Sequence, residues 1–132
     1  SLRGFSPDFR QTNQYFDHVS FGHDVETAYL MLEASHVLGI ENDSKTPRIA
    51  KKMVDHALRH GWDDEHGGLY YEGWYTDAGD SVLIVNDHKA WWVMAEMLNS
   101  LLLMSKLFPD ENLYFEKFYP IFFHHLKNVD CI

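Results

Sequence analysis

At 132 residues, with 45% hydrophobic and 23% charged side chains, the chain has the size and composition of one globular domain. Its net charge of −9 argues against a nucleic-acid partner and against an anionic membrane surface. The one cysteine, Cys131, excludes an internal disulfide framework, and no apolar run is as long as a membrane span. We therefore expect a cytoplasmic protein in which residues 1–132 form a single segment.

The first half of the chain predicts two helices after an irregular lead-in over residues 1–19 that has room for a strand. Apolar residues recur at helical spacing over residues 22–38, and Gly39 stands where a left-handed cap belongs. A Thr-Pro pair at Pro47 predicts the start of the second helix, because proline is tolerated in a first turn. Gly61 predicts its end.

The second half predicts a hairpin followed by two more helices. Residues 61–87 are rich in glycine and contain two short apolar runs, which indicates paired strands. A third helix is expected over about residues 88–107 with Asp87 as its cap, and a fourth after Asp110, kinked or broken at Pro120. The pattern favours an all-α array of α/α hairpins or a toroid. A free-standing four-helix bundle is the alternative.

The stretch "SFGHDVETAYLMLEA", residues 20–34, carries the first candidate for chemistry. His23 and Glu26 are three residues apart, so they share a face of the predicted helix. A carboxylate near a helix N-terminus is stabilised as the anion and can orient or charge-stabilise the imidazole. Histidine is the side chain best suited to move a proton near neutral pH. By itself such a pair is more often a capping or surface interaction.

Other kinds of site find little support. A zinc helix would need a second histidine where Thr27 stands, and His124 and His125 point in different directions on a helix. There is no Gly-x-Ser-x-Gly elbow, and the Gly67-Gly68 pair lacks the Lys-Ser/Thr of a phosphate-binding loop. We therefore expect no metal and no cofactor.

The second candidate stretch is "DHKAWWVMAE", residues 87–96. Trp91 and Trp92 are adjacent, so on a helix they diverge by about 100° and cannot face the same neighbour. One indole can pack in the core while the other offers a flat surface to the C–H side of a sugar ring. The alternative is that both fill a seam between helices. Glu96 lies in an apolar stretch, where a carboxylate needs a hydrogen bond or a perturbed pKa.

Three segments in order, "SFGHDVETAYLMLEA", "GWDDEHGGLYYE" and "DHKAWWVMAEMLNSLLLM", resemble the N-acylglucosamine 2-epimerase family, and within it the cellobiose 2-epimerase branch. The resemblance implies an α/α barrel of six inner and six outer helices with the active site at one mouth. It also implies epimerisation of a mono- or disaccharide. In that scheme a proton leaves C2 of the open-chain sugar, and the resulting enediolate is reprotonated on its opposite face by a second histidine.

The resemblance also implies roles for individual residues. His23 matches one of the two acid/base histidines, and Glu26 matches the carboxylate beside it. Trp91 or Trp92 matches the ring that faces the sugar, and Glu96 the acidic residue of the same helix. These roles fit the chemistry, since a proton beside an aldehyde is acidic only if the developing enediolate is stabilised.

Two departures from the family pattern bear on activity. Met94 stands where a glutamine is usual, and the chain matches a later-middle portion that stops before the second histidine. We therefore expect a fragment that is inactive alone. An aldose–ketose isomerase of the same family is a second reading. A non-catalytic helical module that self-associates through exposed apolar helix faces is a third.

Overall fold

The computed structural model describes residues 18–40, 43–76 and 81–128. In chain order its elements are β1 (His18–Ser20), α1 (Phe21–Val37), α2 (Lys45–His60), β2 (Glu72–Tyr75), β3 (Val82–Asn86), α3 (Trp91–Leu107) and α4 (Leu113–Asn128). The predicted order of two helices, a hairpin and two helices is thus confirmed over the described residues. Apart from the strand β1, the predicted lead-in lies outside the described residues, as does Cys131.

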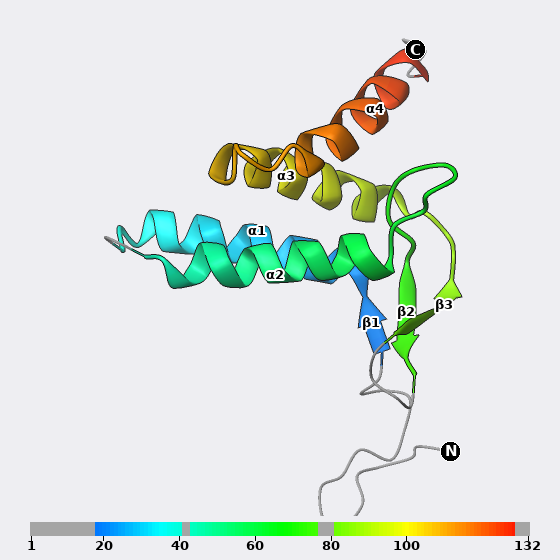
Figure 1. The fold of residues 1–132 in the computed structure, drawn as a ribbon, viewed down its shortest axis with the longest axis horizontal. Helices are drawn as coiled ribbons and strands as arrows, with labels where there is room; N and C mark the ends of the chain where they lie inside the picture. Colours follow the sequence, from blue (N-terminus) through cyan, green and yellow to red (C-terminus); the bar gives the residue numbers. More distant parts are fainter. Residues whose placement is uncertain (1–17, 41–42, 77–80, 129–132) are drawn as a thin grey trace, which may run out of the picture.

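The helices pack side by side in the order α2, α1, α3, α4, which differs from their order along the chain. The first pair, α1 and α2, lies side by side, α3 packs on α1, and α4 packs on α3 (Figure 1). The three strands form one antiparallel sheet in the order β1-β2-β3. This sheet lies at the end of the helical layer where α1 and α3 begin (Figure 1). The starts of α1 and α3 are therefore brought to the same side of the molecule.

The core lies between the helices and is almost wholly apolar. Its buried side chains come from every helix and from the loop after α2; the largest fully buried ones are Tyr114, Phe21, Leu69, Met97, Leu101, Met104, Val25, Val54 and Val93. Burial of each such side chain stabilises the fold by about 1.5–3 kcal/mol before entropy is counted. The buried hydroxyl of Ser100 on α3 donates to the carbonyl of Val25 on α1 at 2.7 Å, so no polar cost arises there.

The predicted glycine cap of α1 is confirmed. Gly39 has φ +61°, a left-handed conformation that glycine adopts without a steric penalty. Its N–H donates to the carbonyl of His36 at 3.0 Å, and the N–H of Ile40 donates to Ser35 at 3.3 Å. This pair of bonds is a Schellman motif, which satisfies carbonyls that the helix end leaves without partners.

Two helix starts differ from the local expectation. The second helix begins at Lys45, because the carboxylate of Asp43 accepts the N–H groups of Lys45 and Thr46 at 3.1 and 2.9 Å. The fourth begins at Leu113, so the expected cap at Asp110 is wrong. Pro120 lies inside α4 without ending it, since it is exposed and water can solvate the carbonyl that loses its partner.

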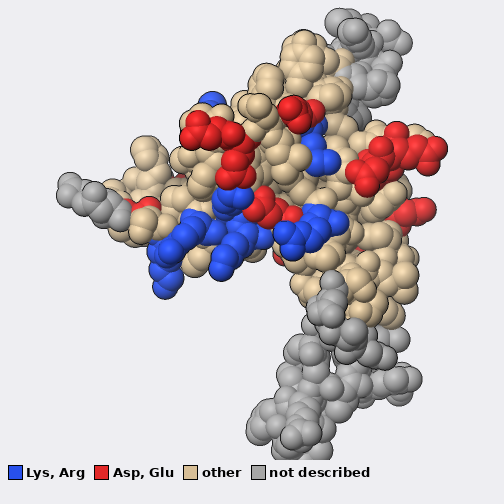
Figure 2. Space-filling model, in the orientation of Figure 1, with Lys and Arg blue, Asp and Glu red and all other residues tan. Residues whose placement is uncertain are grey.

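Basic side chains concentrate on one helix. Figure 2 shows lysine and arginine gathered along α2, which carries Lys45, Arg48, Lys51, Lys52 and Arg59. This agrees with a solvated helix face rather than with a basic groove. Over the described residues, every helix is too short or too polar to pass through a bilayer.

Candidate active site

The candidate site is built at the junction between β1 and α1. Ser20 pairs with Glu72 of β2 and is also the residue that precedes the first turn of α1. The ring of His23, on that first turn, lies back over the junction, and its Nδ1 is 2.6 Å from the Ser20 Oγ. Side chains on a helix point toward its N-terminus, which explains why His23 meets a residue that precedes it.

An aromatic side chain from α3 supports the other side of this imidazole. The rings of His23 and Trp92 have centroids 5.1 Å apart and planes inclined by 53°. Tyr71 contacts the same indole edge-on, with centroids 6.1 Å apart. Gly22 permits the close approach of α3, because a Cβ at that position would lie only 2.6 Å from Trp92 Cη2. The His23 side chain itself is exposed, whereas Trp92 is half-buried.

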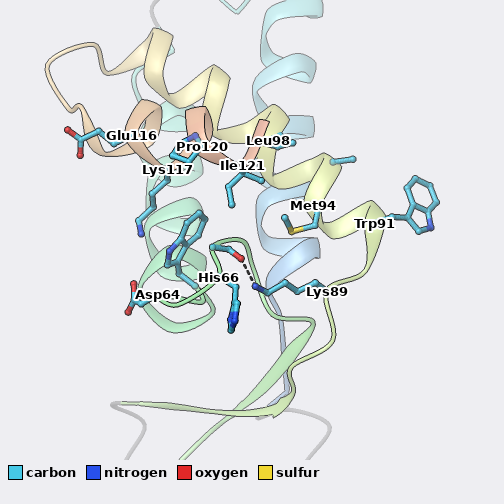
Figure 3. Close-up of a pocket in the computed structure, with 13 residues that line it drawn as sticks. Asp64, His66, Lys89, Trp91, Met94, Leu98, Glu116, Lys117, Pro120 and Ile121 are labelled. Carbon is cyan, nitrogen blue, oxygen red and sulfur yellow. Dashed lines mark hydrogen bonds between the residues drawn. The ribbon is translucent and has the colours of Figure 1, made fainter. Parts of the chain in front are cut away.

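The two tryptophans have different surroundings, as their spacing predicts. Trp91 is 83% exposed and is turned away from the other labelled side chains in Figure 3. It lies at the edge of a pocket of about 900 Å³ between α3, α4 and the loop after α2, whose other lining residues include Trp62, Lys89, Met94 and Lys117. Neither His23 nor Trp92 lines this pocket. The residues predicted from the sequence therefore lie in two places: Trp91 at the pocket, and His23 with Trp92 at the start of α1.

The two predicted carboxylates lie near the His23 and Trp92 pair without bonding to it. Glu26 is half-buried on α1, and Glu96 is half-buried on α3, one helical turn after Trp92. Within the described residues neither carboxylate hydrogen bonds to His23, whose partner is Ser20. The expectation that Glu26 orients or charge-stabilises the imidazole stays a prediction, and the hydrogen-bond partner of His23 Nδ1 in the structure is Ser20. An N-cap serine three residues before a histidine is a signal that was available in the sequence.

Comparisons with known proteins assign the chain to a family. The model of the N-acylglucosamine 2-epimerase (GlcNAc 2-epimerase) family matches residues 6–126.

The chain belongs to the N-acylglucosamine 2-epimerase family.

A search of the curated proteins gave no match. Three solved structures resemble the chain. A D-mannose isomerase has a TM-score of 0.66 and 23% identity over 89% of this chain and 28% of its own. A sugar epimerase from a ruminal bacterium has a TM-score of 0.68 and 22% identity, covering 94% of this chain and 28% of its own. The cellobiose 2-epimerase from Bacillus thermoamylovorans has a TM-score of 0.65 and 23% identity, covering 80% and 25%.

These likenesses confirm the expected fold class, an all-α arrangement of the α/α toroid type. The chain spans only about a quarter of the length of the structures that it matches. The described residues accordingly supply four helices and one small sheet rather than a closed ring. The resemblance read from the sequence is confirmed at the level of the family, which contains sugar epimerases and isomerases.

In this member of the family, the glycine-rich loop is tied to the start of α3. The buried carboxylate of Asp63 accepts the N–H groups of Glu65 and His66, and the Lys89 Nζ donates to it at 2.5 Å. Lys89 also donates to the carbonyl of Gly67 (Figure 3). The Lys89 ammonium and these backbone N–H groups hold the pKa of Asp63 well below its usual range.

This tie explains where α3 begins. Lys89 reaches back to the loop, so the backbone just before the helix stays extended and Ala90 becomes the N-cap, with φ −73° and ψ 139°. The third helix therefore starts at Trp91, and the expected cap at Asp87 is wrong. The bond between Lys89 and Asp63 thus sets the position of the first turn of α3, which carries Trp92.

A second polar cluster escaped the sequence reasoning. The Asp24 carboxylate accepts a hydrogen bond from His56 Nδ1 at 3.1 Å, and His56 Nε2 is 2.6 Å from the Tyr75 hydroxyl. Burial, with the negative charge of Asp24, raises the pKa of Tyr75, so the phenol keeps its proton and donates it to Nε2. Nδ1 then carries the imidazole proton and donates it to Asp24. These three residues join α1, α2 and β2.

Proposed function

We propose that this chain is one sector of a carbohydrate 2-epimerase, in which His23 moves a proton at C2 of an open-chain mono- or disaccharide. The contact between His23 and Trp92 carries this proposal, because it puts a proton-transfer group beside a flat aromatic surface. Ser20 occupies Nδ1, so Nε2 is the nitrogen that remains for a ligand. The exposure of His23 gives a sugar access to it.

The proposed roles follow from position. His23 removes the C2 proton from one face of the sugar as general base, and in the reverse direction it delivers a proton to that face as general acid. The Trp92 indole stacks against the C–H face of the sugar, and it suits this role better than Trp91 because only Trp92 contacts His23. Glu26 and Glu96 are proposed to orient and polarise the substrate through its hydroxyl groups. No metal or cofactor enters this scheme.

The reaction needs two proton-transfer groups on opposite faces of the sugar. Removal of the C2 proton leaves its electron pair in an enediolate, and protonation of C2 from the opposite face gives the epimer. His23 serves one face. Because the chain spans about a quarter of the matched structures, we propose that residues 1–132 match a later-middle sector and that another sector supplies the second group. The isolated chain would then form no epimer.

A cytoplasmic location also stays a prediction.

An isotope experiment tests the proposal and separates it from its nearest alternative. The chain is incubated with cellobiose or N-acetylglucosamine in heavy water, and deuterium in the sugar is located by NMR. We expect label at C2 without inversion, since one acid/base group can exchange the proton on a single face. Replacement of His23 by Gln should abolish the label, whereas His36→Gln, on the same helix and also exposed, should not. Absence of label with the unaltered chain would contradict catalysis by His23.

The alternative enzyme is an aldose–ketose isomerase, which forms the same enediolate but returns the proton to C1. The resemblance to a D-mannose isomerase keeps this alternative open. The same experiment decides between them with mannose as the sugar: label at C1 and a ketose product favour the isomerase. Label confined to C2 favours the epimerase.

A non-catalytic, self-associating helical module is the alternative from another class. Its support is a row of exposed aromatic side chains along α4, where Phe115, Tyr119 and Phe123 are 51%, 50% and 39% exposed. Successive rings in this row contact one another, with centroids 5.9 and 4.4 Å apart. Apolar patches of this kind are unusual on monomers. Sedimentation of a dilute sample tests it, and a monomeric mass would contradict it.

A further inference from the structure

The hydroxyl of Ser20 is used in an unusual way for a residue that begins a helix. Ser20 is the N-cap of α1, and an N-cap serine ordinarily accepts a hydrogen bond from a backbone N–H in the first turn. Ser20 makes no such bond. Its Oγ lies instead 2.6 Å from Nδ1 of His23, the residue whose backbone N–H it would normally cap. A stabilising local bond is thus given up for a contact with an imidazole, a departure that points to function.

Both members of this contact are held from outside. Ser20 is fixed by the pairing of β1 with β2, opposite Glu72, and the preceding Val19 is buried. The His23 ring is held by Trp92, which is itself packed against Tyr71. The hydrogen bond between Ser20 and His23 is therefore set by the fold. It is not a chance contact between two free surface side chains.

We propose that Ser20 is a positioning residue that holds the proton of neutral His23 on Nδ1. This inference rests on the proposed function, in which Nε2 exchanges a proton with the sugar. Nε2 can accept a proton only if its lone pair is free, and a neutral imidazole then carries its hydrogen on Nδ1. The Ser20 oxygen accepts that hydrogen. When Nε2 gains the sugar proton, Nδ1–H keeps donating to Ser20, so one geometry serves both halves of the transfer.

The direction of this bond also fixes where the reactive nitrogen points. The two nitrogens lie on opposite sides of Cε1, so anchoring Nδ1 to the strand end aims Nε2 away from it. Without the anchor the ring retains its contact with Trp92 but is free to flip or to exchange tautomers. Loss of the Ser20 hydroxyl is therefore expected to change which nitrogen of His23 carries the proton and to leave the fold intact.

NMR of the chain with nitrogen-15 in its histidine rings tests the inference without any turnover. At a pH where His23 is neutral, we expect its Nδ1 to have the chemical shift of a protonated nitrogen and its Nε2 that of an unprotonated one. Ser20→Ala should move both shifts toward a mixture of tautomers, and Ser20→Thr, which keeps a hydroxyl, should restore them. Ser35→Ala is the matched control, because Ser35 lies at the far end of α1 and bonds to Asp43.

The ring of His56 serves as an internal check on folding, since its tautomer depends on Asp24 and Tyr75 rather than on Ser20. An Nε2–H tautomer for His23 in the unaltered chain would overturn the inference. So would a Ser20→Ala spectrum in which both His23 shifts are unchanged. These outcomes are independent of deuterium exchange at C2, so failure of the proposed function is told apart from failure of this inference.

Discussion

The imidazole of His23 lies against the indole of Trp92, with the two ring centroids 5.1 Å apart. The residues are 69 positions apart in the chain and come from the first turns of α1 and α3. Two features allow the contact. Gly22 lets α3 approach α1, and the tie from Lys89 to Asp63 fixes where α3 begins.

Gly22→Ala should disturb this contact directly. The new Cβ would lie 2.6 Å from Trp92 Cη2 and 2.7 Å from Val93 Cγ2, so α3 or the indole must shift. Overpacking of this kind lowers the free energy of unfolding by about 1–3 kcal/mol. Urea unfolding gives this value, and the near-ultraviolet circular dichroism of the tryptophans should change as well.

Gly39→Ala is the contrasting variant. No atom lies within 4 Å of a Cβ at this position, but φ is +61°, so only backbone strain of about 1–2 kcal/mol is expected. The tryptophan signal should stay as it is. An unchanged tryptophan signal in Gly22→Ala would contradict the packing described for α1 and α3.

The two tryptophans should respond differently to truncation. Trp92→Leu removes half-buried contacts with His23 and Tyr71, and we expect a loss of about 1–3 kcal/mol in the free energy of unfolding. Trp91→Leu should change it by less than about 0.5 kcal/mol, because that side chain is 83% exposed. Chemical denaturation of both variants measures the difference. Equal losses would show that the indoles share one environment.

The bond between Asp63 and Lys89 predicts a dependence of stability on acid. The pKa of Asp63 is lower in the folded chain than its ordinary 3.8, so its contribution is complete above that pH and is lost as the pH falls below it. Asp63→Asn should therefore have a lower free energy of unfolding than the unaltered chain at neutral pH. The difference between the two free energies should become smaller below pH 3.8. Asp64→Asn, at an exposed neighbour, is the control. A difference in the free energy of unfolding that does not change with pH would contradict a stabilising bond between the Asp63 carboxylate and Lys89.

His60 predicts a second loss of stability on acidification, at a milder pH than that of Asp63. Burial, and then the charges of His56 and Arg59, lower its pKa below 6.5, so the unfolded chain binds the proton more readily. The free energy of unfolding should fall as the pH drops below 6.5, through the interval down to the folded-state pKa. Urea unfolding between about pH 8 and about pH 5 measures this slope. His60→Gln should reduce it, and a slope unaffected by that change would count against the burial of His60.

The sequence indicated most helices and one cap, because these features depend on residues close together in the chain. Gly39 needs only a left-handed conformation after an apolar repeat, and the structure has it there. The start of α3 was predicted at the wrong residue. Lys89, two residues before the helix, bonds to Asp63, which lies 26 residues earlier in the chain. Local capping rules contain no information about such a partner.

The same reason limits the prediction of the site. His23 and Trp92 were named from separate motifs, and the structure brings them together. Glu26 was named beside His23 from helical spacing and from the family resemblance, whereas the direction of side chains on a helix brings His23 back to the earlier Ser20. The Asp24, His56 and Tyr75 cluster joins positions 32 and 19 residues apart, and no periodic pattern marks it.

The most direct test of the account is an NMR titration of the chain with cellobiose, following the imidazole of His23 and the two indole N–H groups. We expect His23 and Trp92 to shift together along one binding curve, with Trp91 unchanged. His23→Gln should leave the Trp92 shift in place while weakening binding. Shifts confined to Trp91, or no shift of any of the three at a sugar concentration that saturates related enzymes, would contradict the claim that His23 and Trp92 form the sugar site.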